Sequence, residues 1–346
     1  MSSVALRDYE GATFNGFTKR LRPKSIQQIV PEYAAYYLRS PRFRGEMSAF
    51  SSLSTRASLN NDMLGRLQIV LPDRMIQEEI GFTLRTLDDK IEQNRQTGRA
   101  LERLARATFK VWFVDFEPVK AKAAGQASFP GMSPAIFAAL PDQLNDSPIG
   151  LIPQGWAVRP LKETVKLTMG QSPSSEFYNL TGQGLPFHQG VSDHGFRFPS
   201  RRVYSTVEGR MAEAGDVLLS VRAPVGRINV ADVRMVLGRG LAGMRHKQGK
   251  QSFLLYLMQH HFAEDDAVGD GTIYKSVNKD FVEAMPLIAP PSETLQAFED
   301  AAVPMDEMIS SLAKESCQLA ALRDYLLPKL LNGQVRVHLS QAEAKV

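Results

Sequence analysis

The chain repeats itself at an interval of 218 residues, and this duplication constrains its fold more than any other feature of the sequence. Residues 59–113 match residues 277–331 without an insertion; for example, Leu87-Asp88 aligns with Met305-Asp306. The interval is too long for a solenoid, whose repeats span roughly 20–45 residues. It predicts two similar halves related by pseudo-twofold symmetry.

The similarity continues upstream of this block with less regularity. Tyr36-Tyr37-Leu38 matches Leu255-Tyr256-Leu257, and Leu21-Arg22 matches Met244-Arg245. The second copy extends further, to about residues 152–156, where the first has no counterpart. We therefore expect the first half to be incomplete, with apolar side chains such as Tyr33, Tyr36 and Tyr37 exposed.

Each copy ends in a heptad pattern long enough for a coiled-coil helix. The predicted seams are Ile80, Leu84, Leu87, Ile91, Leu101 and Trp112 in the first helix, and Phe298, Met305, Ile309, Leu312, Leu319 and Leu326 in the second. Asn94 weakens the first seam, and Pro304 is expected to kink or divide the second helix. Asn332-Gly333 is a good C-terminal stop. We predict that the two helices pack antiparallel as a rigid spacer, the alternative being that each packs only on its own domain.

Composition constrains the fold and function of the chain less than the repeat does. Hydrophobic residues make up 43% of the chain and its formal charge is +4, which is ordinary for a globular protein and only weakly favours a nucleic-acid partner. The single cysteine, Cys317, lies in an apolar helical pattern and is expected to face the core. One cysteine excludes a disulfide framework, and a reducing cytoplasm is expected. No apolar run approaches the ~20 residues of a membrane span, so no membrane partner is expected.

Residues 151–290 have the pattern of a mixed α/β domain. We predict strands at Val217–Val221, Arg227–Val230 and Met285–Ile288, and a helix at Ser252–Phe262. The segment 117–150 is rich in Ala, Gly, Pro and Ser, which predicts a linker with a short helix near 134–140. Polar and basic groups are frequent in the α/β domain, among them His188, Arg197, Arg227 and Arg239.

Three motifs resemble catalytic, cofactor or metal sites without their full pattern. Residues 238–243 match G-x-G-x-x-G, but they lie deep within a domain and lack the context of a dinucleotide site. Residues 289–292 share only prolines with the tetrapeptide of amino-methyltransferases. His260-His261 with Glu264 lacks a third metal ligand at a suitable spacing. We therefore expect no catalytic residue, no bound cofactor and no metal.

Several segments together resemble the specificity (S) subunits of type I restriction–modification enzymes. Residues 87–95, LDDKIEQNR, running on to FKVWFVDF at 109–116, are similar to the family's central conserved region. Residues 322–333, LRDYLLPKLLNG, are similar to its distal conserved region. Residues 152–156, IPQGW, resemble the start of a target-recognition domain, and residues 215–218, GDVL, its internal strand.

The resemblance implies an α+β fold in which two mixed α/β target-recognition domains, the first incomplete, are joined by two long antiparallel helices. The expected segments are the end of the first recognition domain (1–73), the central spacer helix (74–116), the linker (117–150), the second recognition domain (151–290), the distal spacer helix (291–334) and a tail (335–346).

The resemblance also implies a non-catalytic subunit that recognises one part of a split double-stranded DNA target with each domain. Methyltransferase (M) subunits and restriction (R) subunits would dock on it, and S-adenosylmethionine, ATP and Mg²⁺ would belong to those partners. Because Arg and Lys neutralise phosphates and Arg, Gln and Ser contact base edges, we predict a set of DNA-binding residues. They are Lys19, Arg20, Arg22, Arg56, Gln171, Ser172, Gln189, Arg201, Arg202, Arg222 and Lys275. A coiled-coil interaction scaffold without DNA recognition is the alternative.

Overall fold

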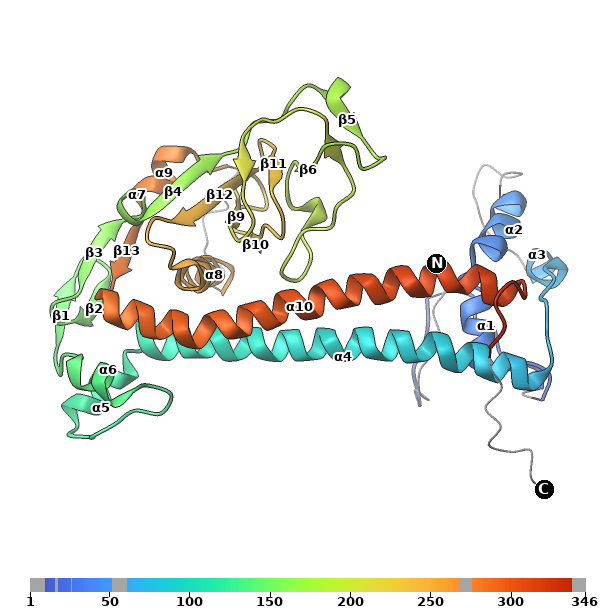
Figure 1. Ribbon diagram of the computed structural model, residues 1–346, viewed down its shortest axis with the longest axis horizontal. Coiled ribbons are helices and arrows are strands. Elements are labelled where there is room, and N and C mark those ends of the chain that lie inside the picture. Colours follow the sequence, from blue (N-terminus) through green and yellow to red (C-terminus); the bar gives the residue numbers. More distant parts are fainter. Residues whose placement is uncertain (1–9, 16–17, 26, 52–60, 268–275, 338–346) are drawn as a thin grey trace. The chain divides into compact units, whose positions relative to one another are not determined.

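The computed structural model describes residues 10–15, 18–25, 27–51, 61–267 and 276–337. The chain divides into two compact units: Met1–Gly98 with Ser311–Val346, and Arg99–Ser310. Two long helices, α4 (Arg74–Phe113) and α10 (Ser292–Leu331), each contribute residues to both units (Figure 1).

The described residues of the first unit form helices and connecting segments, without a strand. Besides parts of α4 and α10 it contains α1 (Pro31–Tyr37), α2 (Pro41–Ser51) and α3 (Asn61–Arg66). The expectation that Tyr33, Tyr36 and Tyr37 are exposed is wrong, because all three are buried in one cluster with Leu84 and Leu327. The ends of α4 and α10 supply the apolar surface that covers these rings.

Helices α4 and α10 pack antiparallel. In the first unit, Leu84 shares a core with Leu327, and Asn94 donates a hydrogen bond to Glu315 at 2.7 Å. In the second unit, Phe298 packs against Phe109, with ring centroids 5.9 Å apart. As residue numbers rise along α4, those of the contacting residues fall along α10, so the two helices are antiparallel, as the family resemblance implies. Trp112 and Phe298, one from each predicted seam, pack with their ring centroids 6.1 Å apart.

The seam positions differ in how deeply they are buried. Ile80, Leu84, Ile91, Trp112, Phe298 and Ile309 are buried, whereas Leu87, Leu101, Met305, Leu312, Leu319 and Leu326 are half-buried. Asn94 is buried despite its polarity, and its bond to Glu315 satisfies one of its donors.

The second unit contains small sheets and short helices (Figure 1). Its strands are β1 (Leu144–Ser147), β2 (Gly150–Pro153), β3 (Ala157–Pro160), β4 (Val165–Met169), β5 (Tyr178–Asn179), β6 (Leu185–His188), β7 (Tyr204–Ser205), β8 (Met211–Ala212), β9 (Val217–Ser220), β10 (Ile228–Val230), β11 (Met235–Leu237), β12 (Leu241–His246) and β13 (Pro286–Ala289). Its helices, besides parts of α4 and α10, are α5 (Glu117–Ala123), α6 (Pro134–Ala139), α7 (Leu161–Thr164), α8 (Gln251–Ala267) and α9 (Lys279–Ala284), with short 3₁₀ turns at Ser175–Phe177 and Val191–Asp193. The predicted strands at β9, β10 and β13 and the predicted helix at α8 are confirmed.

Four sheets share this unit. Their strand orders are β1-β2, β10-β9-β12-β4, β5-β7-β6-β11-β8 and β13-β3. The buried face of the second sheet packs with α8 and with an aromatic cluster of Phe109, Phe113, Phe253 and Phe298. The spacer helices therefore share one hydrophobic core with this sheet.

Three expectations need correction. Residues 117–150 are not an open linker, because α5, α6 and β1 lie there and Val119 and Phe137 enter the core. The helix near 134–140 is confirmed, with the Ser133 side chain capping it. Pro304 does not divide α10, which is one helix, since neighbouring backbone bonds and packing against α4 compensate for one missing donor; that Pro304 kinks the helix stays a prediction. Cys317 is exposed rather than core-facing.

Other features agree with expectation. Helix α10 ends at Leu331, just before Gly333, whose φ of 75° is the left-handed conformation that favours glycine. None of the described helices combines the length and apolar character that a membrane span requires.

We predict that Leu84→Ala lowers the free energy of unfolding by about 2–5 kcal/mol, because it leaves a cavity where α4 packs on α1 and α10. The matched control is Leu322→Ala on α10, whose side chain is exposed and should cost about 0.5 kcal/mol or less. Urea denaturation followed by circular dichroism measures both. Equal losses would contradict the packing.

Candidate nucleic-acid interface

Residues 238–240 form a tight connection between β11 and β12, where the two larger sheets meet. The Gly238 N–H donates to the His188 carbonyl at 2.8 Å, and the Gly240 N–H to the Gln189 carbonyl at 3.0 Å. The Gly240 carbonyl in turn accepts from the Val221 N–H at 2.9 Å. These bonds join the ends of β6 and β9 to the same short loop.

Glycine is required here because backbone approaches backbone. A Cβ on Gly238 would lie 2.6 Å from the Cα of Gln189, and one on Gly240 would lie 2.4 Å from the Gln189 carbonyl oxygen. The glycine motif therefore serves close packing of the chain. It leads into strand β12 rather than a helix, which agrees with the rejection of a dinucleotide site.

Polar side chains from four segments gather around this loop. The Arg239 N–H donates to the Ser172 hydroxyl at 3.3 Å, and the neighbouring Gln171 N–H donates to Leu237 at 2.9 Å. Arg222 forms an isolated β-bridge with Ser276. We call the group the Arg239 surface; it comprises Gln171, Ser172, Gln189, Arg222, Arg239 and Ser276. Arg222, Arg239 and Ser276 line an open hollow of about 390 Å³.

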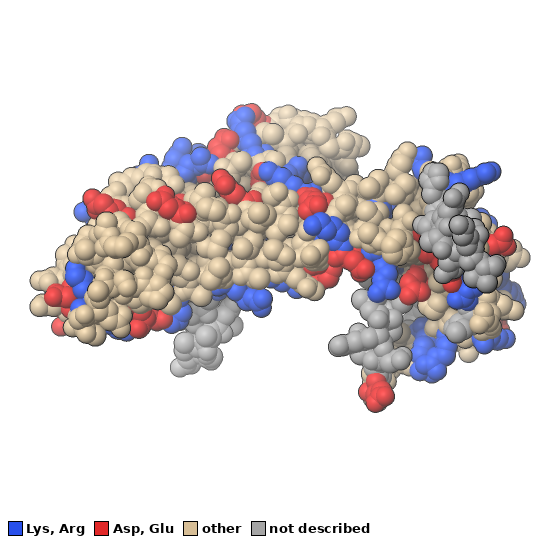
Figure 2. Space-filling model, turned by 60° about the horizontal axis from the view of Figure 1, so that its bottom comes forward, with Lys and Arg blue, Asp and Glu red and all other residues tan. Residues whose placement is uncertain are grey.

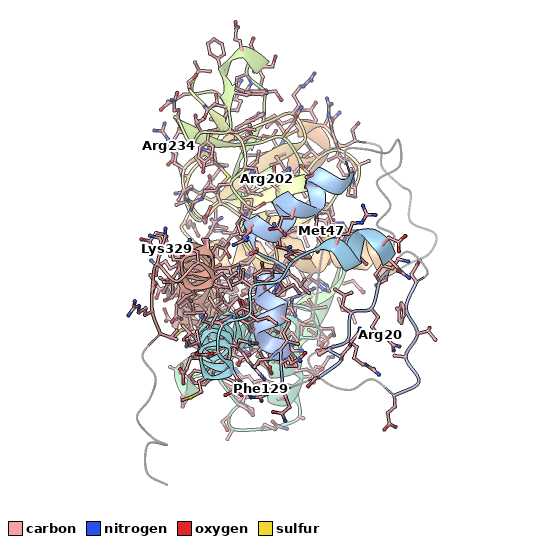
Figure 3. The ribbon with its side chains drawn as sticks, turned by 90° about the vertical axis from the view of Figure 1, so that its right-hand side faces the viewer. Arg20, Met47, Phe129, Arg202, Arg234 and Lys329 are labelled. Carbon is pink, nitrogen blue, oxygen red and sulfur yellow. The ribbon has the colours of Figure 1, made fainter. Side chains whose placement is uncertain are left out.

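The two arginines of this surface are available for an external anion. Both are exposed, and neither has an acidic partner among the residues that the structure describes. Some other arginines of the unit are paired with carboxylates: Arg202 contacts Asp193 at 2.5 Å, and Arg234 contacts Glu208 at 3.1 Å (Figure 3). The face shown in Figure 2 likewise mixes basic with acidic groups instead of presenting one large basic patch.

The structure brings together four of the predicted DNA-binding residues: Gln171, Ser172, Gln189 and Arg222. Lys275 lies outside the described residues, immediately before Ser276. Arg201 and Arg202 lie away from this group in ion pairs with Asp232 and Asp193, and their role in DNA binding stays a prediction. Arg239 was not among the predicted contacts. The signal that could have found it is its place between two glycines that need close approach.

The predicted residues of the first unit form no comparable group. Lys19, Arg20 and Arg22 are exposed on the stretch 18–25 that precedes α1, and the Arg20 guanidinium lies over the Phe14 ring at 5.4 Å (Figure 3). Arg56 lies outside the described residues.

Two histidines follow each other closely in the chain after β6 begins: His188, which is buried, and His194, which is half-buried. Burial lowers the pKa of His188, although Asp193 and Asp232 oppose the shift. Burial, with a further contribution from His188, lowers the pKa of His194 to about 4. Both rings are therefore neutral at neutral pH and add no positive charge to the surface.

Arg197, expected as a surface group, is buried and anchors the sheets to the helices. Its guanidinium pairs with Asp306 on α10 and lies 3.4 Å from Glu102 on α4. Asp306 also accepts hydrogen bonds from the hydroxyls of Tyr256 at 2.5 Å and Ser252 at 2.6 Å on α8. Burial alone would lower the pKa of Arg197, but the charges facing it, Asp306 first, leave that pKa raised.

The first unit repeats this anchor at the equivalent aspartate. Asp88, which aligns with Asp306, accepts a hydrogen bond from the Tyr36 hydroxyl at 2.8 Å and pairs with Arg323 at 2.5 Å. The sequence alignment placed Tyr37 opposite Tyr256, but Tyr36 makes the bond. A tyrosine and an arginine thus meet a helix aspartate in both copies.

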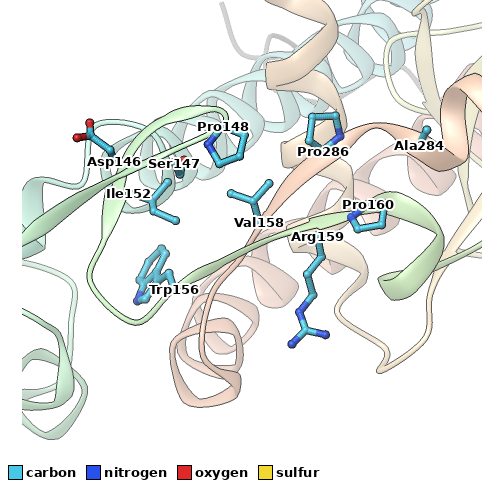
Figure 4. A pocket seen from close by; sticks show the side chains of 10 residues that line it. All are labelled: Asp146, Ser147, Pro148, Ile152, Trp156, Val158, Arg159, Pro160, Ala284 and Pro286. Carbon is cyan, nitrogen blue, oxygen red and sulfur yellow. The ribbon is translucent and has the colours of Figure 1, made fainter.

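A second hollow, of about 440 Å³, lies where β3 passes the β1-β2 hairpin (Figure 4). Ile152, Trp156 and Val158 are among its lining residues, and its one basic residue, Arg159, faces Glu163 at 3.3 Å. It contains none of the predicted DNA-binding residues.

Comparison with known proteins agrees with this architecture. Residues 1–103 match the type I restriction modification DNA specificity domain. The chain is 29% identical, over 92% of its length and 71% of the relative, to a Methanocaldococcus jannaschii protein provisionally named as the specificity subunit of the type I restriction enzyme MjaX. It is 26% identical to the HindI specificity subunit of Haemophilus influenzae, over 84% of this chain and 74% of that one. The chain is thus similar, over most of its length, to type I restriction specificity subunits.

A solved specificity subunit shows the same fold. The crystal structure of the type I restriction–modification S subunit from M. genitalium superposes with a TM-score of 0.54 at 15% identity, covering 89% of this chain and 74% of that one. The predicted α+β fold of the specificity subunits is confirmed. Within the described part of the chain, no group of three or more His, Cys, Asp or Glu side chains could hold a metal ion.

We predict that Asp306→Ala lowers the free energy of unfolding by about 3–5 kcal/mol, because it leaves the Arg197 guanidinium buried without its main partner. Glu307→Ala, at the exposed neighbouring position, should change it by about 0.5 kcal/mol or less. Chemical denaturation compares the two variants, and similar values would show that the anchor contributes little.

We also predict an acid-dependent loss of stability. A folded-state pKa of about 4 for His194, below its ordinary value of 6.5, means that the folded state favours the neutral ring. This contribution is present above pH 6.5 and is lost as the pH falls toward 4. His194→Phe keeps a ring without a titrating group and should flatten the dependence of the urea midpoint on pH in that window. An unchanged profile would contradict the assignment.

Proposed function

We propose that the second unit binds duplex DNA sequence-specifically through the Arg239 surface, as the recognition part of a type I restriction specificity subunit. The observation that carries this proposal is the pair of exposed arginines, Arg222 and Arg239, without acidic partners and set among amide and hydroxyl side chains. The family match, which names a DNA specificity domain, supports it.

The chemistry of the surface suits the major groove. Arginine donates two hydrogen bonds to O6 and N7 of guanine, and glutamine pairs with N6 and N7 of adenine. Arg222 and Arg239 can supply the first kind of contact or neutralise phosphates, and Gln171 and Gln189 the second. The glycine-built loop beneath them fixes the backbone that carries these side chains.

The remaining roles follow the family. Each half of the chain would recognise one part of a bipartite target, with the spacer helices setting the interval between the parts. Methyltransferase and restriction subunits would dock on the chain, and S-adenosylmethionine, ATP and Mg²⁺ would be bound by those subunits. Exposed apolar side chains on the helices support such docking: Leu104, Met308, Leu322 and Tyr325.

Replacing either surface arginine should weaken binding to duplex DNA and reduce its salt dependence. For Arg222→Ala and for Arg239→Ala, the slope of log affinity against log salt should decrease in magnitude by about 1, because one phosphate-neutralising charge is removed. Fluorescence anisotropy with one fixed duplex over a salt series measures this slope.

Arg234→Ala is the matched control, since that arginine is exposed but paired with Glu208 and Glu213. It should leave the slope nearly unchanged. Selection from a random duplex pool then tests specificity. An equal effect of all three substitutions would place the interface elsewhere, and no enriched sequence would favour the scaffold alternative.

A further inference from the structure

The connection between α3 and α4 exposes three consecutive apolar side chains. Ile69, Val70 and Leu71 are 37%, 42% and 47% exposed. The stretch runs as an open connection into the first turn of α4 (Figure 1). Because scattered single apolar residues are ordinary on a surface but contiguous ones mark contact sites, this stretch requires an explanation.

The backbone of this stretch is held on one side only. The carbonyls of Gln68, Val70 and Pro72 accept hydrogen bonds from Tyr37, Tyr33 and Gln77 at 3.3, 2.7 and 2.8 Å. In extended chain, alternate residues direct their N–H and C=O groups to opposite sides. The groups of Ile69 and Leu71 therefore face away from α1, and they make no hydrogen bond within the described residues.

The second copy shows what covers the equivalent stretch. Residues 69 and 70 align with Leu287 and Ile288 of β13, which are only 6% and 7% exposed. There β13 pairs antiparallel with β3, with Leu287 opposite Arg159 and Ile288 opposite Val158. No strand of the first unit, within its described residues, plays the part of β3.

Two exposed positions near the start of α4 are also apolar where the second copy has charged residues. Met75 and Phe82 are 58% and 68% exposed. Their counterparts on α10, Glu293 and Asp300, are charged and lie in water as expected. Apolar residues at exposed positions where the other copy has carboxylates indicate a surface that another chain covers.

We propose that residues 68–71 are an open sheet edge that binds a β-strand of a second polypeptide, one with the alternating pattern of β3. The incoming strand lies antiparallel, hydrogen-bonds to the outward backbone groups of Ile69 and Leu71, and places an apolar side chain opposite Val70, as Val158 lies opposite Ile288. The partner is thus a polypeptide that carries a segment similar to residues 150–164 of this chain. This binding requires no DNA and is independent of the function proposed above.

A labelled peptide of residues 150–164 tests the edge directly. Fluorescence anisotropy with the intact chain, in the absence of DNA, should give saturable binding. Leu71→Pro removes one outward N–H that has no partner within the described residues, and it should weaken binding about tenfold, the equivalent of one lost hydrogen bond. Leu71→Ala keeps that N–H and should bind within about threefold of the parent.

Val70→Asp gives a second, independent variant, because it alters the side chain opposite the incoming apolar residue without changing the backbone donor. It should also weaken binding about tenfold. Circular dichroism of each variant establishes that it is folded. Absence of saturable binding to the parent chain would overturn the proposal. Equal binding by the parent and both weakened variants would also overturn it, since the peptide would then occupy another site.

Discussion

The antiparallel contact between α4 and α10 is the interaction on which the rest of the structure depends. The core of the first unit contains residues of both helices, among them Leu84 and Leu327, and the larger core of the second unit contains Phe109 and Phe298. A helix that is apolar along one stripe must bury that stripe, and here each helix supplies the surface that the other needs. Both units are therefore built on one shared pair of helices.

A half-buried aspartate on each helix then joins that pair to its neighbours. Asp306 holds Arg197 and Tyr256, and Asp88 holds Arg323 and Tyr36. Buried charge is costly unless it is fully partnered, so such a group tolerates few arrangements of the surrounding elements. We infer that these anchors fix how the neighbouring helices and loops meet the spacer pair, which apolar packing alone would leave less defined.

The two copies both pack on the pair of long helices, but they differ in the elements that they add and in the side chains that they expose. In the second copy, sheets cover the start of α10. The Arg239 surface lies around the loop 238–240, whose close backbone contacts require glycine. In the first copy, the described residues form helices and connecting segments without a strand, and the stretch equivalent to β13 is exposed. The duplicated sequence explains the common plan, and the differing exposure marks the stretch 69–71, which we propose as a binding edge.

The sequence by itself determined the duplication, the heptad patterns, the resemblance to specificity subunits and several strands, because each depends on residues close in sequence or on a regular period. It also predicted Gln171, Ser172, Gln189 and Arg222 as candidate contacts, from residue type alone. Only the tertiary structure decided that these four lie together with Arg239, that Arg197 is buried, and that Tyr33, Tyr36 and Tyr37 are covered. Those outcomes depend on contacts between segments far apart in the chain, and whether an arginine faces an external anion or an internal carboxylate depends on which distant segment the fold places beside it.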